Sequence, residues 1–160
     1  MKKKPKKANS SFHAYYELTK PSITFLILIS TALGFYLGSY ETLNKLNLFV
    51  TLLGSSLVSS GSGALNHFLE AKTDSLMNRT KLRPIPSGII KSKIVLIFGL
   101  ILIVSGSLLL LIFINKLTCV LSLITAILYL FVYTPLKKLT WLNTSIGAIP
   151  GAIPPLGGWA

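Results

Sequence analysis

The sequence predicts an all-α fold, a polytopic bundle of membrane-spanning helices. Of the 160 residues, 51% are hydrophobic and only 12% are charged, and the apolar residues gather in long uncharged runs. A membrane-spanning helix needs about 20 mainly apolar residues, whereas a soluble core does not require runs of this length. Basic residues also gather in alternate connections between the runs, as they do in membrane proteins with Lys- and Arg-rich cytoplasmic connections.

Four apolar runs are long enough, or nearly so, to cross a bilayer. They lie at residues 23–38, 48–65, 94–114 and 117–132. The second run is rich in Gly, Ser and Ala, which allow helices to approach closely, so we expect it inside the bundle. A fifth run begins near Leu142 and continues to Ala160; its prolines Pro150, Pro154 and Pro155 predict an irregular or kinked helix.

The charge distribution predicts the topology. The chain has sixteen basic and four acidic residues, which gives a net charge of +12. Fourteen of the sixteen lie before the first run, between the second and third, or after the fourth, and only Lys45 and Lys116 lie in the opposite connections. The pattern predicts a basic cytoplasmic arm at residues 1–20, a membrane domain at residues 21–160 and a cytoplasmic connection at residues 66–88.

This distribution explains the positive charge without nucleic-acid binding, and the expected contact is the lipid bilayer. The N-terminal basic run contains lysine but no arginine, which is unlike an organellar transit peptide. We therefore expect a bacterial plasma membrane.

A polar face follows the second run. Asn66, Glu70 and Asp74 recur at intervals of four residues and include half of the chain's carboxylates. If the helix continues, all three side chains lie on one face. Mg²⁺ prefers oxygen ligands, commonly takes one or two protein carboxylates and completes its shell with water and phosphate oxygens. The alternative is that the two carboxylates merely pair with basic residues of a solvated loop.

Basic residues follow this face. Arg79, Lys81 and Arg83 come next, and Pro84 and Pro86 predict a stiff, extended path that holds them beside the carboxylates. An arginine fork matches phosphate oxygens, and a lysine supplies a point charge. The alternative is that a cytoplasmic connection is basic for topological reasons alone.

The fourth run ends in another polar group, Tyr133, Lys137 and Lys138. Tyr133 and Lys137 would lie one turn apart on a continuous helix, but Pro135 predicts a break between them. An interfacial tyrosine with a snorkelling lysine is also ordinary membrane anchoring.

At these stretches the sequence resembles the UbiA superfamily of intramembrane prenyltransferases, and within it the haem O synthases (protohaem IX farnesyltransferases). The matching stretches are YYELTKPSITF at residues 15–25, ALNHFLEAKTDSLMNRTKLRPIPSG at residues 64–88 and YTPLKKLTWLNTSIGAIPGAIPPLGGWA at residues 133–160. The second is similar to the first Asp-rich motif of the superfamily, with Glu70 for the middle Asp, followed by RTxxRPxPSG. Ser22 departs from the pattern, because family members often carry Arg there.

The resemblance implies a helical bundle around a lipid-open cavity and a reaction that transfers a farnesyl group from farnesyl diphosphate to a vinyl group of haem B, giving haem O. It assigns Mg²⁺ to Asn66, Glu70 and Asp74. Tyr133 and Lys137 would lie beside the allylic carbon and the leaving group. Diphosphate binding would fall to Arg79, Lys81, Arg83 and Lys138. Haem A synthase or oxidase assembly factors would be protein partners.

The superfamily has further spans and a second Asp-rich motif, whereas this sequence ends within the fifth run and has no acid after Asp74. We therefore expect the N-terminal portion of such an enzyme, inactive alone. Two other readings stay open: a UbiA-type prenyltransferase for an aromatic quinone or chlorophyll precursor, and a non-catalytic membrane bundle or transporter fragment.

Overall fold

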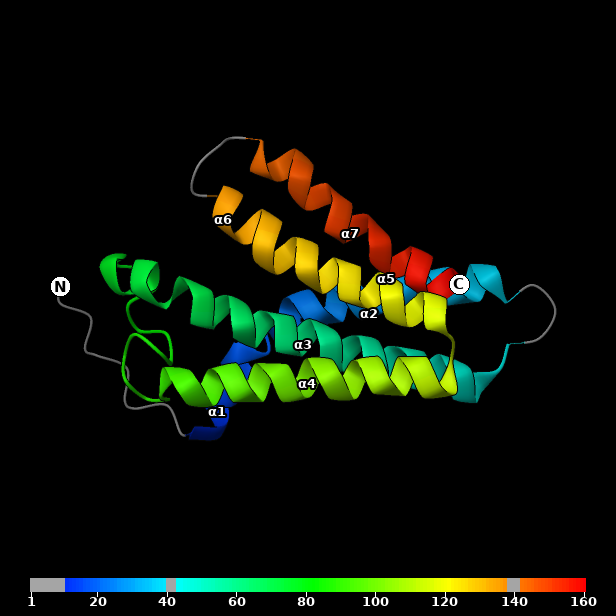
Figure 1. Ribbon diagram of the computed structural model, residues 1–160, viewed down its shortest axis with the longest axis horizontal. Coiled ribbons are helices and arrows are strands. Elements are labelled where there is room, and N and C mark those ends of the chain that lie inside the picture. The colour runs from blue at the N-terminus through cyan, green and yellow to red at the C-terminus, as the bar shows by residue number, and fades with distance from the viewer. Residues whose placement is uncertain (1–10, 40–42, 138–141) are drawn as a thin grey trace, which may run out of the picture.

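The structure is a computed structural model that describes residues 11–39, 43–137 and 142–160. The predicted lysine run at residues 2–7 and Lys138 lie outside the described residues. Within the described part the fold is all-α, as predicted, and contains no strand (Figure 1). Its helices are α1 (Ser11–Leu18), α2 (Pro21–Gly38), α3 (Lys45–Leu76), α4 (Ser92–Phe113), α5 (Lys116–Ile127), the π-helix η1 (Leu128–Tyr133), α6 (Thr134–Leu136) and α7 (Asn143–Trp159).

Four segments of the described chain are long and apolar enough to cross a membrane. They are Pro21–Gly38, Lys45–Leu76, Ser92–Phe113 and Lys116–Leu136, the last of which combines α5, η1 and α6. These segments confirm the four predicted spans. Helices α2 and α4 begin at one end of the bundle, and α3 and α6 end there. It is the left-hand end in Figure 1.

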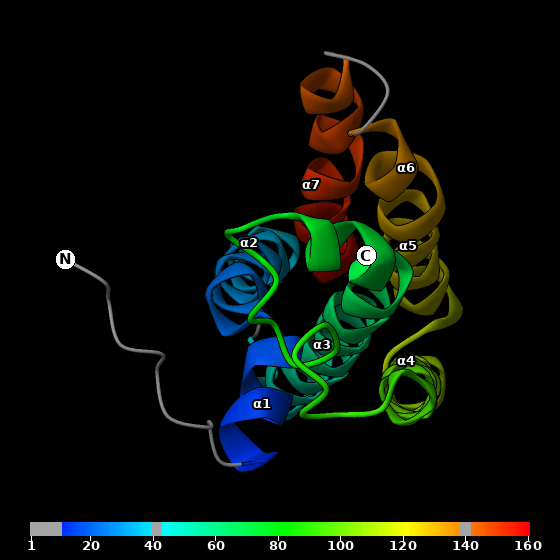
Figure 2. The ribbon, with the colours of Figure 1, turned by 90° about the vertical axis from the view of Figure 1, so that its left-hand side faces the viewer.

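Helix α3 lies inside the bundle, as its small residues predicted, and packs against α1, α2, α4, α5 and η1. Figure 2 shows it between α1 and α2 on one side and α4 and α5 on the other. Two glycine pairs bring α3 and α4 into backbone contact: a Cβ added at Gly61 would lie 2.6 Å from the Gly99 oxygen, and one at Gly106 would lie 2.6 Å from the Gly54 oxygen. Close contact of this kind stabilises helix pairs in lipid through van der Waals packing.

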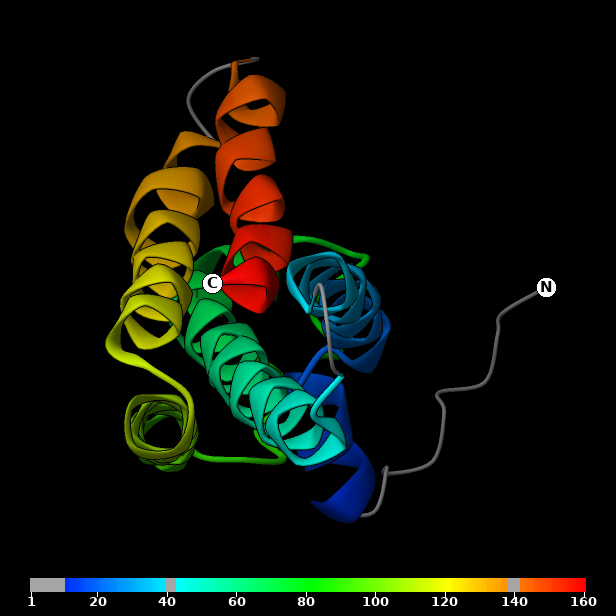
Figure 3. The same cartoon turned by 90° about the vertical axis from the view of Figure 1, so that its right-hand side faces the viewer.

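The segment predicted as an irregular or kinked helix is the helix α7, which continues from Asn143 to Trp159 with all three prolines inside it. Each proline removes one backbone donor, but α7 gains close packing against α2 and α5. A Cβ at Gly34 would lie 2.0 Å from the Pro155 oxygen, and one at Gly158 would lie 2.1 Å from the Thr31 oxygen. Figure 3 shows the C-terminal residue at the end of the bundle where α3 begins, and there Asn115 Nδ2 donates to the Ala160 oxygen at 3.0 Å.

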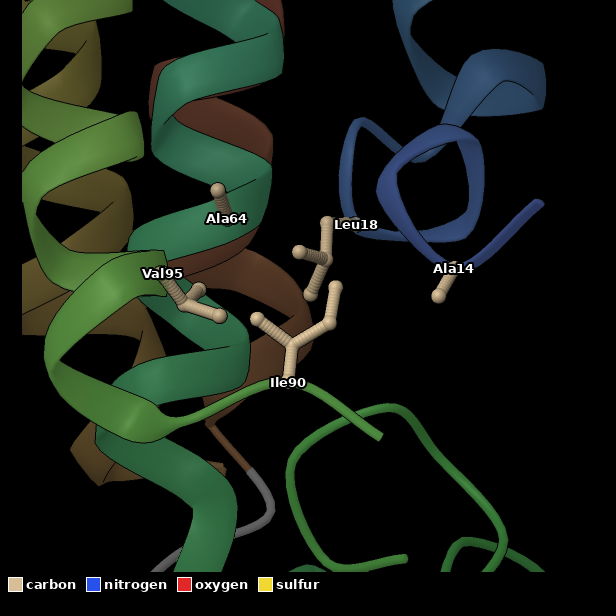
Figure 4. Close-up of a cluster of buried hydrophobic side chains, with 5 residues drawn as sticks. All are labelled: Ala14, Leu18, Ala64, Ile90 and Val95. Atoms are coloured by element: carbon tan, nitrogen blue, oxygen red, sulfur yellow. The ribbon is translucent and has the colours of Figure 1, made fainter. Parts of the chain in front are cut away.

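At the opposite end, an apolar cluster fastens α1 and residues 77–91 to the bundle. Leu18, Ile90 and Val95 point toward one another in Figure 4, with Ala64 of α3 beside them. Because Leu18 is the last residue of α1, the cluster also fixes the turn that leads from α1 into α2.

Residues 77–91 form a series of turns, so the prediction of an extended path was wrong. Arg83 N donates to the Thr80 oxygen and Ser87 N to the Arg83 oxygen, both at 3.0 Å. The Thr80 hydroxyl donates to the backbone carbonyl oxygen of Asp74 at 3.1 Å, which connects the turns to the end of α3. The backbone angle of proline suits the second position of a turn as well as an extended segment, so Pro84 and Pro86 did not distinguish the two.

Candidate metal and anion site

Asn66, Glu70 and Asp74 lie on one buried face of α3. The helix continues to Leu76, as the spacing required, and the three residues are 0%, 4% and 4% exposed. A solvated loop, the alternative reading, is therefore wrong for these side chains. Two carboxylates buried at this depth need partners, because an unpaired buried charge is very costly.

The partners of the carboxylates come from two different segments. Arg83 Nη1 lies 2.7 Å from Asp74 Oδ2 and 4.0 Å from Glu70 Oε2. Lys137 Nζ lies 2.5 Å from Glu70 Oε1. The Arg83 and Lys137 side chains are 23% and 31% exposed, so both reach inward from the rim onto acids that are almost fully buried.

Lys20 is the third cation of the site, and the sequence reasoning missed it. Its Nζ donates to Asn66 Oδ1 and, at 2.9 Å, to the Tyr129 hydroxyl. Burial lowers the pKa of Lys20 to about 8; the Glu70 charge opposes this shift, while the Lys137 and Arg83 charges add to it. The sequence counted Lys20 only as one of many basic residues before the first span.

The Asn66 amide is fixed at both atoms. Its Nδ2 donates to Thr134 Oγ1 at 2.9 Å, and the Thr134 hydroxyl in turn donates to the backbone carbonyl oxygen of Tyr129 at 2.8 Å. These bonds direct the amide oxygen, the atom that could bind a metal, toward Lys20. Thr134 was also missed, although it belongs to the YTPLKK stretch that the sequence analysis singled out.

Tyr133 and Lys137 are joined by continuous helix, so the predicted break at Pro135 was wrong. Lys137 N donates to the Tyr133 oxygen at 3.0 Å. Pro135 lies near the start of α6, directly after the π-helical segment, so the helix changes its hydrogen-bond pattern just before the proline and continues past it. The Tyr133 ring stacks on Tyr129, with centroids 5.7 Å apart and planes at 17°.

Two of the other predicted diphosphate residues, Arg79 and Lys81, do not contact the carboxylates, and Lys138 lies outside the described residues. Arg79 is exposed, and within the described residues its side chain makes no hydrogen bond or ion pair. Lys81 is exposed too, and its Nζ donates to Asn78 Oδ1 at 3.0 Å. Of Arg79, Lys81 and Arg83, the turns of residues 77–91 therefore direct Arg83 alone onto the carboxylates of α3.

A cavity of about 420 Å³ lies between α2, α3, α5, η1 and α7. Lys20, Tyr129 and Tyr133 line it close to the charged site, and hydroxyl-bearing residues such as Thr24 and Ser59 line it deeper in the bundle. Lys20 thus contacts both the Asn66 amide and the cavity. An otherwise apolar cavity with a cationic end suits a ligand that has an apolar body and an anionic head.

The donor set of this face fits Mg²⁺ only together with an anion. Within the described chain no three His, Cys, Asp or Glu side chains gather as metal ligands; the predicted set is two carboxylates and one amide oxygen. Each of these three groups already accepts from Lys20, Arg83 or Lys137. Mg²⁺ normally supplements one or two carboxylates with phosphate oxygens and water, which is the arrangement this set permits.

Fold and site together define an integral membrane protein of packed helices with a buried charged site at one end of its bundle. The chain belongs to the UbiA prenyltransferase family, whose profile matches residues 27–160.

Relatives extend this result along nearly the whole chain. The protoheme IX farnesyltransferase of Solibacter usitatus is 42% identical over 155 residues, which cover 91% of this chain and 53% of that protein. The protoheme IX farnesyltransferase of Trichodesmium erythraeum is 44% identical over 150 residues, covering 93% of this chain and 46% of that protein. The chain therefore spans about half the length of the curated relatives it matches.

A solved structure, described in a study of digeranylgeranylglyceryl phosphate synthase in membranes, superimposes with a TM-score of 0.72. Its sequence is 22% identical, and the match covers 91% of this chain and 54% of the other. At this identity the likeness shows a shared fold.

Proposed function

We propose that this chain carries the diphosphate-binding end of a prenyltransferase that transfers a farnesyl group from farnesyl diphosphate to a vinyl group of haem B, giving haem O. The observation that carries the proposal is the buried α3 face, where Glu70 and Asp74 are paired with Lys137 and Arg83. The names of the two relatives support the choice of farnesyl donor and haem acceptor.

In this proposal Asn66, Glu70 and Asp74 hold Mg²⁺ together with diphosphate oxygens. The metal supplies positive charge where the leaving group becomes more negative. Arg83 and Lys137 turn from the carboxylates to the phosphate oxygens and neutralise the remaining charge. Arg79 and Lys81, which are exposed, contribute long-range attraction for the anion, and Lys138 is a further candidate for diphosphate binding.

The diphosphate leaves with the electron pair of its bond to the allylic carbon. The stacked rings of Tyr129 and Tyr133, which line the cavity, face a cationic allyl group and stabilise it as aromatic faces stabilise other cations. The vinyl π electrons of haem B then form the new carbon–carbon bond, and water captures the resulting cation with loss of a proton. A cavity with little water protects the allylic cation until the acceptor attacks.

The same proposal sets the topology. Residues 1–20 and the connection at residues 66–88 face the cytoplasm of a bacterium, because basic residues accumulate in these parts of the sequence; residues 21–160 form the membrane domain. Haem A synthase or oxidase assembly factors are the expected protein partners.

The test is complementation in proteoliposomes. The chain is reconstituted alone and together with the C-terminal half of the Solibacter usitatus relative, and supplied with farnesyl diphosphate, Mg²⁺ and haem B. We expect haem O from the pair, little from the chain alone, and a loss of product with Asp74→Asn but not with Lys93→Met. Absence of haem O from the pair, while the intact relative is active, would contradict the proposal; prenylation of 4-hydroxybenzoate instead would favour an aromatic acceptor.

A further inference from the structure

Counted over the residues that the structure describes, the charged site contains one more cation than it has carboxylates. Lys20, Arg83 and Lys137 surround Glu70 and Asp74, so three positive charges face two negative ones. Arg83 and Lys137 each contact a carboxylate. Among the described residues, the Lys20 ammonium contacts only neutral oxygens, and no carboxylate oxygen lies within 4.0 Å of it. A half-buried ammonium without a counter-anion is partly desolvated at a cost, so within the described residues the site lacks an anion.

The backbone of Lys20 has a strained, left-handed conformation. Lys20 has φ 48° and ψ 60°, and it is the one non-glycine residue of the described chain with a positive φ. A left-handed conformation costs a residue with a Cβ about 1–2 kcal/mol. Lys20 N donates to the Glu17 oxygen at 3.2 Å and Thr24 N to the Lys20 oxygen at 3.1 Å, which hold the turn. Strain that persists beside a binding site is a reason to look for a functional role.

We propose that Lys20 is a third diphosphate-binding cation and that it occupies the Asn66 amide oxygen until a metal–diphosphate complex replaces it. The proposal rests on the proposed function and deepens it. Each of the three groups that would hold the metal accepts from a basic side chain. A free divalent ion would displace all three cations and leave them without an acceptor. A metal–diphosphate complex gives each displaced cation a phosphate oxygen.

The charges agree with this exchange. One divalent metal ion raises the excess at the site from one positive charge to three, and a diphosphate ester carries about three negative charges near neutral pH. The occupied site is then close to neutral, whereas metal alone leaves it strongly positive. Metal and diphosphate must therefore bind with positive coupling, and each improves the affinity of the other by the same factor.

The experiment measures metal and diphosphate binding separately. The purified chain in lipid nanodiscs is titrated with Mn²⁺ alone, followed by electron paramagnetic resonance, and with farnesyl thiodiphosphate in the presence of Mg²⁺, followed by calorimetry. For Lys20→Met we expect thiodiphosphate affinity to fall about tenfold or more, the usual effect of a lost charged hydrogen bond. Mn²⁺ alone should bind severalfold tighter, because a like charge is gone. Lys20→Arg should retain thiodiphosphate binding.

Lys93→Met is the matched control, because Lys93 is exposed and lies at the start of α4, at the same end of the bundle. It should change neither affinity. Lys20→Gly provides a second variant that removes the cation and also the left-handed strain. We expect it to unfold at the same temperature as the unsubstituted chain or higher, and yet to lose thiodiphosphate affinity like Lys20→Met.

The proposal is tested by two opposite effects of removing the Lys20 charge, weaker thiodiphosphate binding and tighter Mn²⁺ binding. If Lys20→Met and Lys20→Gly weaken both ligands together, or change neither, Lys20 has a structural role only and the proposal is overturned. If the unsubstituted chain takes up no thiodiphosphate with Mg²⁺, the proposed function fails as well, and the two failures are thereby distinguished.

Discussion

Arg83 and Arg79 have the same side chain on the same turn-rich segment, but only Arg83 contacts the carboxylates. Its Nη1 lies 2.7 Å from Asp74 Oδ2, whereas Arg79 is exposed. We therefore expect Arg83→Gln to weaken both folding and diphosphate binding, and Arg79→Gln to change little. Both variants replace an arginine of the same segment by glutamine and remove one positive charge. A difference between them in stability or affinity therefore reports the contact of Arg83 with Asp74.

The magnitude follows from burial. Arg83→Gln leaves the Asp74 carboxylate, with 6% of its side chain exposed, without its ion-pair partner. Breaking a fully buried pair costs about 3–5 kcal/mol. Because the Arg83 side chain is 23% exposed, part of its charge is already solvated, and about 1.5–3 kcal/mol is the expected loss. For a chain of this size the unfolding temperature should fall by about 3–10 °C, and affinity for farnesyl thiodiphosphate with Mg²⁺ by about tenfold.

Thermal unfolding in nanodiscs and calorimetric titration measure the two quantities on the same samples. Arg79→Gln should remain within about 0.5 kcal/mol of the unsubstituted chain, as surface substitutions usually do. The reasoning would be refuted if both arginine variants lost equal stability and equal affinity, because charge in the segment, rather than contact with Asp74, would then be what matters.

Three further outcomes follow from the packing and from the metal-binding face. Gly61→Ala places a Cβ 2.6 Å from a backbone oxygen of α4 and should cost about 1–3 kcal/mol of stability. Gly151→Ala meets no atom within 4 Å, so its unfolding temperature should stay the same or rise. Equal shifts of the unfolding temperature in the two variants would count against this packing of α3 on α4. Thr134→Val removes the acceptor of Asn66 Nδ2 and should weaken Mg²⁺–thiodiphosphate binding by about 1 kcal/mol in a calorimetric titration. The exposed Lys93→Met, outside the cavity, is the unaffected control. Chelation of divalent metal by EDTA should abolish thiodiphosphate binding, and binding that persists would exclude a metal-dependent site.

Local spacing predicted the α3 face because it depends on one helix alone. Residues at intervals of four stay on one side of any continuous α-helix, so Asn66, Glu70 and Asp74 could be grouped without knowledge of the packing. The glycines and serines of the same helix predicted its interior position for an equally local reason, since small residues permit close helix contact.

The partners of that face could not be predicted in this way. Lys20 is 46 residues from Asn66 and 109 from Tyr129, and Thr134 is 68 residues from Asn66. Which helices approach one another decides these contacts, and no periodicity encodes it. Pro135 was misjudged for a related reason: a proline removes one donor, but the surrounding helix could widen to a π-turn and remain continuous.

Topology and binding are not competing explanations for the basic residues at this end of the bundle. A positive-inside preference requires that lysines and arginines be present there, and exposed residues such as Lys91 and Lys93 meet that requirement fully. It does not require any of them to contact a buried oxygen. Lys20, Arg83 and Lys137 each do so, against the desolvation that such contacts entail. Contact with buried Asn66, Glu70 or Asp74 therefore separates the basic residues of the site from those that merely set orientation, and charge counting along the sequence cannot make that separation.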